Sequence, residues 1–178
     1  MKDNSILKMV LCLVVIAVAV SCLLSVVNNV TAPLIEQNSV KKLEKSLASV
    51  IDADKFNAIS NEGDTVVYEA LKDGEKVGFA VENHEKGYGG DITVLTGISN
   101  DMKVCGVEIL SMSETAGLGA NASNESFRNQ YKGKTGDISV VKNSPKDNEI
   151  EAISGATVTS SAVTRAVNAA IKTAKEVK

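Results

Sequence analysis

A long apolar run near the N-terminus is the strongest pattern in the chain. Residues 9–27 are almost entirely apolar. At 1.5 Å per residue, about 19 such residues cross a hydrocarbon core of about 30 Å. The polar exceptions, Ser21 and Ser25, can return hydroxyl hydrogen bonds to the preceding helical turn, so they are compatible with a span. The pattern predicts a transmembrane helix over residues 9–27, preceded by a short segment, residues 1–8.

Basic residues flank this run unevenly, which predicts its orientation. Lys2 and Lys8 precede it, and the next basic residue is Lys41. The positive-inside rule therefore places residues 1–8 in the cytoplasm and the C-terminal domain outside it. Two alternatives are a cleaved signal peptide, whose apolar core is normally shorter, and a lipoprotein signal ending at Cys22, which matches poorly. We expect a single-pass anchor in the lipid bilayer of the cell membrane.

Helical spacing continues after the apolar run. Pro33 can open a helix, and Leu43, Leu47 and Val50 recur at spacings near three, four and seven, as do Leu34 and Ile51. This pattern predicts an amphipathic helix, followed by an irregular connection over residues 52–64. Residues 28–64 are therefore predicted to be a helical connector.

Strand patterns dominate the next part of the chain. Residues 65–71 and 76–81 flank Asp73-Gly74, a pair typical of hairpin turns. A second pair, residues 91–98 and 103–110, flanks a polar turn. Further elements are a short helix within residues 124–131, short strands at 138–141 and 149–153, and a C-terminal helix over 160–178. Residues 65–178 are predicted to be one α+β domain with a mainly antiparallel sheet of about four strands and flanking helices.

Composition narrows the chemistry of this domain. The net charge is −3, which does not suggest a nucleic-acid partner. The three Cys are scattered and His84 is the only His, so no zinc, iron–sulfur or thiol-redox motif exists. No nicotinamide-binding fingerprint occurs either. We predict no catalytic residue and no metal site. Aromatic residues are only 3% and Trp is absent, so a planar ligand must pack mainly against aliphatic groups and backbone.

The sequence Glu-Ala-Ile-Ser-Gly-Ala-Thr-Val-Thr-Ser at residues 151–160 is the best candidate for a site. A strand, a Gly turn and a helix start present backbone N–H groups to an anion. Gly155 and Ala156 allow a phosphate or an enzyme to come close. The Thr157 hydroxyl has no neighbouring base, so its modification requires an external catalyst. The alternative interpretation is an ordinary turn followed by a capped helix.

Two other glycine-rich segments have similar character. Residues 113–119 read Ser-Glu-Thr-Ala-Gly-Leu-Gly, and residues 87–92 read Gly-Tyr-Gly-Gly-Asp-Ile. Gly117 and Gly119 bracket Leu118, which can lie against a flat ring, and Tyr88 can shield such a ring. Each segment alone is also typical of a loop at the end of a strand.

Together with the N-terminal anchor, these segments resemble a known family over about the whole chain. The family comprises the FMN-binding subunits of two membrane redox complexes: RnfG of the Rnf electron transport complex, and NqrC of the sodium-translocating NADH:quinone reductase. Its flavinylation motif reads Asp-x-x-Ser/Thr-Gly-Ala-Thr, and here Glu151 replaces the Asp. Its Glu-Thr-Pro-Gly-Leu-Gly segment has Ala116 in place of the Pro. Chain length favours the Rnf member of the family.

The resemblance implies a function and a site. It implies FMN linked to Thr157 by a phosphodiester, installed by a magnesium-dependent flavin transferase that uses FAD and recognises Glu151. The chain would be an electron-relay subunit of an ion-translocating ferredoxin:NAD oxidoreductase complex, with the other membrane and peripheral subunits as partners and no catalysis by the isolated chain. The other residues expected at the cofactor are Ser154, Gly155, Ala156, Thr159, Glu114, Thr115, Gly117, Leu118, Gly119 and Tyr88.

Two other functions are compatible with the sequence. One is a stand-alone flavinylated electron carrier outside the cytoplasm. The other is a membrane-anchored scaffold domain that has lost the cofactor, for which the departures at Glu151 and Ala116 argue.

Overall fold

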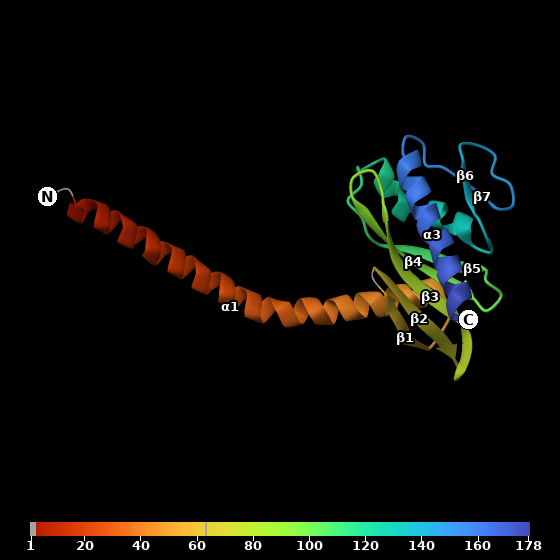
Figure 1. Cartoon of the computed structure of the whole chain (residues 1–178), viewed down its shortest axis with the longest axis horizontal. Helices are drawn as coiled ribbons and strands as arrows, with labels where there is room; N and C mark the ends of the chain where they lie inside the picture. Colours follow the sequence, from red (N-terminus) through yellow and green to blue (C-terminus); the bar gives the residue numbers. More distant parts are fainter. Residues whose placement is uncertain (1–2, 63) are drawn as a thin grey trace. The chain divides into compact units, whose positions relative to one another are not determined.

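The computed structural model describes residues 3–62 and 64–178 (Figure 1). The chain divides into two compact units, Met1–Leu43 and Glu44–Lys178. Lys2, on which the predicted orientation partly depends, lies outside the described residues, as do the side chains of Pro33 and Leu34.

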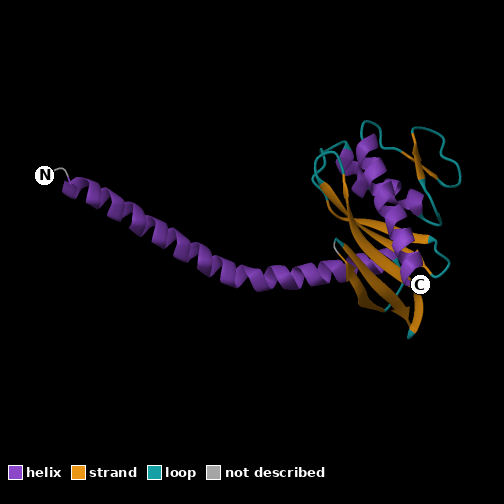
Figure 2. Cartoon of the chain, in the orientation of Figure 1, coloured by secondary structure: helices purple, strands orange, loops and turns teal. Residues whose placement is uncertain are grey.

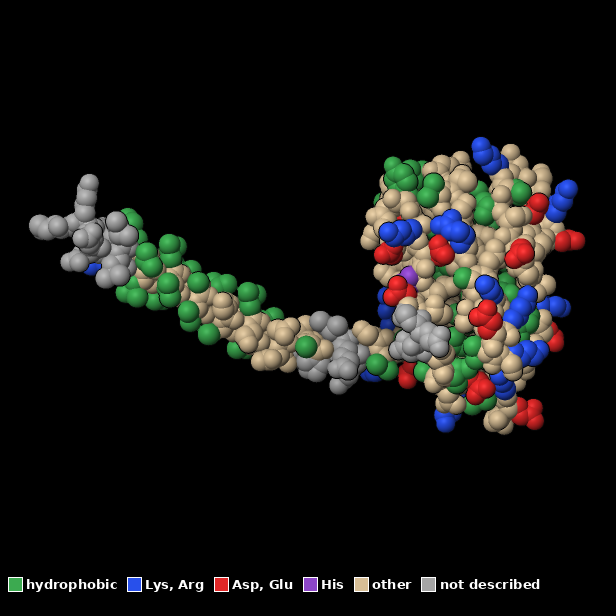
Figure 3. Space-filling model, viewed as in Figure 1, with side chains coloured by type: hydrophobic (Ala, Val, Ile, Leu, Met, Phe, Trp, Pro, Cys, Tyr) green, Lys and Arg blue, Asp and Glu red, His purple; other side chains and the backbone are tan. Residues whose placement is uncertain are grey.

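The first unit consists of the N-terminal part of one long helix, α1 (Asp3–Val50). Its segment Lys8–Asn29 has a mean hydropathy of 3.1 and is long and apolar enough to cross a membrane. Figure 3 shows hydrophobic side chains around this part of the helix. The prediction that Pro33 opens a new helix is wrong, because α1 runs through it. An interior proline costs a helix about 3 kcal/mol.

The second unit is built on a five-stranded antiparallel sheet in the order β1-β2-β3-β4-β5 (Figure 2). The strands are β1 (Lys55–Glu62), β2 (Thr65–Lys72), β3 (Glu75–Lys86), β4 (Asp91–Ser99) and β5 (Val104–Ser111). The predicted hairpins β2–β3 and β4–β5 are present. The predicted number of strands is one too low, because β1 lies where an irregular connection was expected. This edge strand is mostly polar and is fixed by its pairing with β2, which a local pattern does not reveal.

One face of the sheet carries the main hydrophobic core. Helix α3 (Thr157–Val177) packs on β3 and β4 and begins three residues before the predicted start. Its buried face joins Phe79, Val81 and Ile98 of the strands. Around this core lie η1 (Gly119–Ser123), α2 (Glu125–Arg128), η2 (Asn129–Tyr131) and the parallel pair β6 (Ser139–Val141) and β7 (Glu149–Glu151).

The opposite face receives the last turn of α1, which belongs to this second unit. Gly97 and Gly106 are cross-strand partners in β4 and β5, and both lie against Val50. A Cβ built on Gly97 would lie 2.6 Å from the Val50 carbonyl carbon, and nearer still to its oxygen. Leu47 and Val50 are buried there, with 3% and 2% of their surface exposed. The glycine pair therefore lets helix backbone rest directly on strand backbone.

Candidate functional site

The three glycine-rich segments meet in the fold and line one cleft of about 510 Å³. They are the loop between β3 and β4, the segment after β5, and the start of α3. The volume is within the usual range for small-molecule sites. The lining residues are Tyr88, Glu114, Thr115, Leu118, Gly119, Gly155, Ala156, Thr157, Val158 and Thr159.

Most of the predicted site residues are therefore brought together, with three exceptions. Ser154, Gly117 and Glu151 do not line the cleft, and all three are exposed. Val158 lines the cleft but was not predicted. Its position one residue after Thr157 at a helix start is the signal that could have identified it.

Glu114 lies where the three segments meet. Its Oε1 accepts hydrogen bonds from the backbone N–H groups of Tyr88 and Gly89, at 2.9 and 3.0 Å. Its Oε2 accepts a 2.6 Å hydrogen bond from the Thr159 hydroxyl. Burial alone would raise the pKa of the Glu114 carboxyl, but the hydrogen bonds from Thr159, Gly89 and Tyr88 together lower it below the usual value. Glu114 is therefore a charged carboxylate at neutral pH.

Several glycines make room for this arrangement. A Cβ on Gly119 would lie 2.5 Å from Oε2 of Glu114 and 2.7 Å from Oγ1 of Thr159. A Cβ on Gly87 would overlap Oε1 of Glu114, and one on Gly89 would overlap the Ser113 carbonyl oxygen. Gly119 thus allows the protein's own segments to approach one another, in addition to any approach of a ligand.

The start of α3 exposes backbone donors to the cleft. Gly155 adopts a φ of +76°, and Ala156 occupies the N-cap position with no side-chain capping hydrogen bond. Ser160 closes the turn, since its hydroxyl donates to the Ala156 carbonyl and accepts from the Ile153 N–H, both at 3.0 Å. The first three N–H groups of a helix have no intrahelical acceptor. The alternative interpretation of residues 151–160 is correct in expecting a turn followed by a helix, but no side chain caps that helix.

The two threonines of this first turn differ sharply in accessibility. Thr157 is exposed, and its hydroxyl makes no hydrogen bond within the described part of the chain. Thr159 is 1% exposed and donates to Glu114. Apolar side chains stand at the rim, where Tyr88, Leu118 and Val158 are all exposed. The cleft therefore presents the exposed Thr157 hydroxyl at a helix start that has no side-chain cap, beside an apolar rim.

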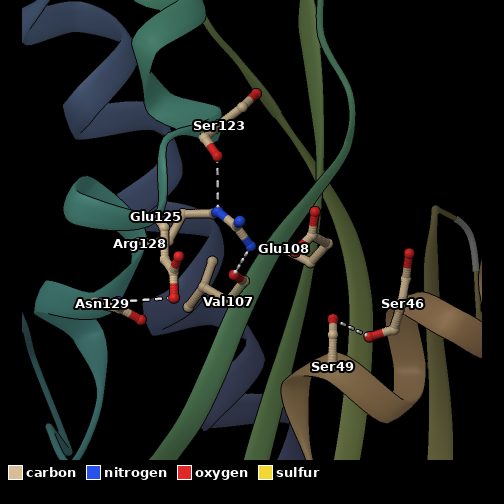
Figure 4. A network of polar contacts seen from close by, with 8 residues as sticks. All are labelled: Ser46, Ser49, Val107, Glu108, Ser123, Glu125, Arg128 and Asn129. Carbon is tan, nitrogen blue, oxygen red and sulfur yellow. Dashed lines mark hydrogen bonds and ion pairs between the residues drawn. The ribbon is translucent and has the colours of Figure 1, made fainter.

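A polar network connects η1 and α2 to strand β5 (Figure 4). Arg128 of α2 forms an ion pair with Glu108 of β5. Its guanidinium also donates to the carbonyl oxygens of Ser123 and Val107, at 2.9 and 3.0 Å. These contacts fix the segment that follows Leu118 against the sheet. Sequence reasoning missed this network, because nothing in the local sequence pairs residues 20 positions apart.

Charge in the cleft comes from Glu114 alone, since its lining contains no Lys, Arg or His. An anionic group must therefore be held by backbone N–H groups at the helix start. Among the described residues, no group of three or more His, Cys, Asp and Glu side chains could hold a metal ion. The donor set suits a phosphate ester attached to a flat, largely apolar body.

Comparison with known proteins agrees with this geometry. Residues 87–172 match the family model of the FMN-binding domain, and residues 1–50 match that of the RnfG N-terminal region. NqrC from Shewanella oneidensis has the same fold, with a TM-score of 0.55 and 21% identity over 69% of this chain and 66% of its own. Its counterpart in the Na(+)-translocating NADH-quinone reductase of Parabacteroides distasonis gives a TM-score of 0.54 and 23% identity, over 66% of this chain and 73% of its own.

Curated relatives define the family more narrowly. The chain is 37% identical over 174 residues to the G subunit of the proton-translocating ferredoxin:NAD(+) oxidoreductase complex of Clostridium ljungdahlii, covering 96% of this chain and 93% of the relative. In an alignment of 194 positions it is 36% identical to the Na(+)-translocating counterpart of Acetobacterium woodii, which covers 94% of this chain and 90% of the relative. The chain belongs to the RnfG family, the G subunits of Rnf-type ion-translocating oxidoreductase complexes.

Proposed function

We propose that this chain is the FMN-carrying electron-relay subunit of a membrane-bound ion-translocating ferredoxin:NAD oxidoreductase complex, and that Thr157 bears the FMN. The observation that carries the proposal is the cleft itself. All three segments that resemble the family converge there, and the exposed Thr157 hydroxyl lies at the start of an uncapped helix. The names of the relatives supply the complex and its other subunits as partners.

The residues present fit FMN. The N–H groups of residues 157–159 would hold the phosphate, and Leu118, Val158 and Tyr88 would pack against the ring system. When bound, FMN supplies one-electron transfer between donor and acceptor. The protein's part is to bind and orient the cofactor, since the described cleft contains no acid–base pair.

Attachment requires a second protein. In the proposed step, the Thr157 oxygen forms a bond to the FMN phosphorus of FAD, the pyrophosphate bond breaks and AMP leaves. The hydroxyl proton passes to a base of the flavin transferase, because none is available beside Thr157. Glu151 is exposed at the end of β7, where an external enzyme can reach it. Thr159 is an unsuitable acceptor, because its hydroxyl is buried and donates to Glu114.

We also propose the membrane arrangement expected from the sequence. Residues 1–8 would lie in the cytoplasm, residues 9–27 would span the bilayer, residues 28–64 would lead out of it, and the domain over 65–178 would lie outside the cytoplasm. The apolar segment Lys8–Asn29 and the membership of the family support this arrangement.

In-gel flavin fluorescence after denaturation tests the proposed attachment. The full chain is produced together with a flavin transferase, as wild type, Thr157→Ala and the control Ser154→Ala, which removes a neighbouring exposed hydroxyl. A fluorescent band is expected for wild type and the control, and none for Thr157→Ala. A dark wild-type band, or fluorescence that survives Thr157→Ala, contradicts the proposal.

The site gives no support to the scaffold function, and it fits the stand-alone carrier and the complex subunit equally well. The departures from the family motifs, Glu151 and Ala116, are exposed and lie outside the lining of the cleft, so they leave it intact. Loss of the cofactor therefore has no structural basis here. Co-purification of the chain with integral membrane subunits distinguishes the complex from a stand-alone carrier, which would purify alone.

A further inference from the structure

The Glu114 carboxylate joins parts of the chain that are far apart in sequence. Its partners Tyr88 and Gly89 are 26 and 25 residues earlier, and Thr159 is 45 residues later. The loop at residues 87–90 closes on itself, because the Gly87 N–H donates to the Gly90 carbonyl at 2.9 Å. Two further N–H groups of this loop, those of Tyr88 and Gly89, point to Glu114. Glu114 thus binds two walls of the cleft, the 87–90 loop and the first turn of α3.

The packing around Glu114 indicates a built arrangement. Gly87 and Gly119 leave no space for a Cβ beside the two carboxylate oxygens. Both carboxylate oxygens accept from donors of this chain, and the donor from α3 is the Thr159 hydroxyl. The Glu114 anion therefore uses no backbone N–H group at the start of α3, and those groups remain available for a phosphate. Hydrogen bonds to a charged acceptor are stronger than neutral ones, so a carboxylate suits this place better than an amide.

We propose that Glu114 is a positioning residue that holds the 87–90 loop and the first turn of α3 together around the cleft before any cofactor is attached. The proposal rests on the proposed function for its significance, because Tyr88 and Thr157 are the groups so positioned. Glu114 acts through these residues and donates nothing to the attachment step itself.

Hydrogen–deuterium exchange of the full chain in detergent, produced without a transferase, tests this. In Glu114→Ala, the amides of Tyr88 and Gly89, which donate to Glu114, and of Ser160, which donates to the Ala156 carbonyl at 3.0 Å, should exchange roughly tenfold faster or more. Glu114→Gln should be intermediate, since its amide oxygen still accepts from Tyr88 and Gly89 but carries no charge. The control Glu176→Gln changes the same charge at an exposed position of α3 and should match wild type.

The pattern of exchange separates positioning from general stability. Positioning confines the change to the two walls, whereas faster exchange throughout the β-sheet in Glu114→Gln would overturn the proposal. If Glu114→Ala does not fold, Glu114→Gln and Thr159→Val decide, and unchanged wall amides in both would overturn it. Absence of flavin from wild type co-produced with a flavin transferase, together with exchange at the two walls that depends on Glu114, contradicts the proposed function alone. Flavin on Thr157 with walls indifferent to Glu114 contradicts this inference alone.

Discussion

Substitution of Gly97 by alanine should lower the stability of the domain, because Gly97 is where the last turn of α1 packs on the sheet. A Cβ at this position would lie 2.6 Å from the carbonyl carbon and 3.1 Å from the Cβ of Val50, and closer still to the carbonyl oxygen. None of these atoms can rotate away, because they belong to the backbone or its first side-chain carbon. Overpacking of this kind costs about 1–3 kcal/mol.

The alternative response is that the last turn of α1 leaves the sheet. This would expose Leu47, Val50 and Ile51, which are all at least 95% buried. At about 1.5–3 kcal/mol for each side chain, detachment costs several kcal/mol more than local strain. The strands should therefore give way locally while the helix end stays in place.

The free energy of unfolding of the full chain, measured with urea in detergent, should fall by about 1–3 kcal/mol in Gly97→Ala, or by roughly 3–10 °C in melting temperature. Gly90→Ala is the matched control, because its Cβ would make an ordinary 3.5 Å contact, and it should lie within about 0.5 kcal/mol of wild type. Equal stability of the two variants would refute the reasoning, as would selective loss of exchange protection at residues 47–50.

Two further predictions concern the cleft and its support. Because the folded pKa of Glu114 is lowered, its charge stabilises the fold above the unfolded pKa, and this stabilisation is lost as pH falls through the folded value. The extra urea stability of wild type over Glu114→Gln should therefore be present at pH 7 and shrink as the solution is acidified below the usual pKa range of glutamate, and a pH-independent difference would exclude this linkage. Arg128→Met should lower the free energy of unfolding by about 1–3 kcal/mol, because it leaves Glu108 and two carbonyl groups without their hydrogen-bond donor. The control Arg165→Met breaks the more exposed ion pair with Glu85 and should cost under about 1 kcal/mol in the same measurement. Equal losses in the two variants would argue against a supporting role for Arg128.

Local pattern predicted those elements whose signals are local. The Asp73-Gly74 turn sits at positive φ between β2 and β3, as such a pair should. The edge strand β1 was not predicted, because it is fixed by pairing with β2. Helix α3 begins before its predicted start, because Thr157 enters the helix without a capping side chain. Only the first of these errors arises because an interaction with another segment decides the structure.

Most residues of the cleft were predicted from the sequence, but the contacts between them were not. Resemblance of the three segments indicated that Tyr88, Leu118 and Thr157 belong together, and they line one cleft. The role of Glu114 as a shared acceptor did not follow, since it depends on distances between segments. The same holds for Gly119, expected to admit a ring and found to admit the chain's own carboxylate.

The absence of cations from the lining of the cleft has a consequence for how long a flavin would stay. Backbone N–H groups alone hold a phosphate modestly, and in the proposed arrangement the domain lies outside the cytoplasm, where little free FMN is available to rebind. Non-covalent occupancy would therefore decline with each dissociation. The proposed bond to Thr157 would replace that equilibrium by an effective concentration on the order of millimolar, which dilution cannot lower. A cleft with low non-covalent affinity for FMN would therefore be sufficient if the cofactor is covalently attached.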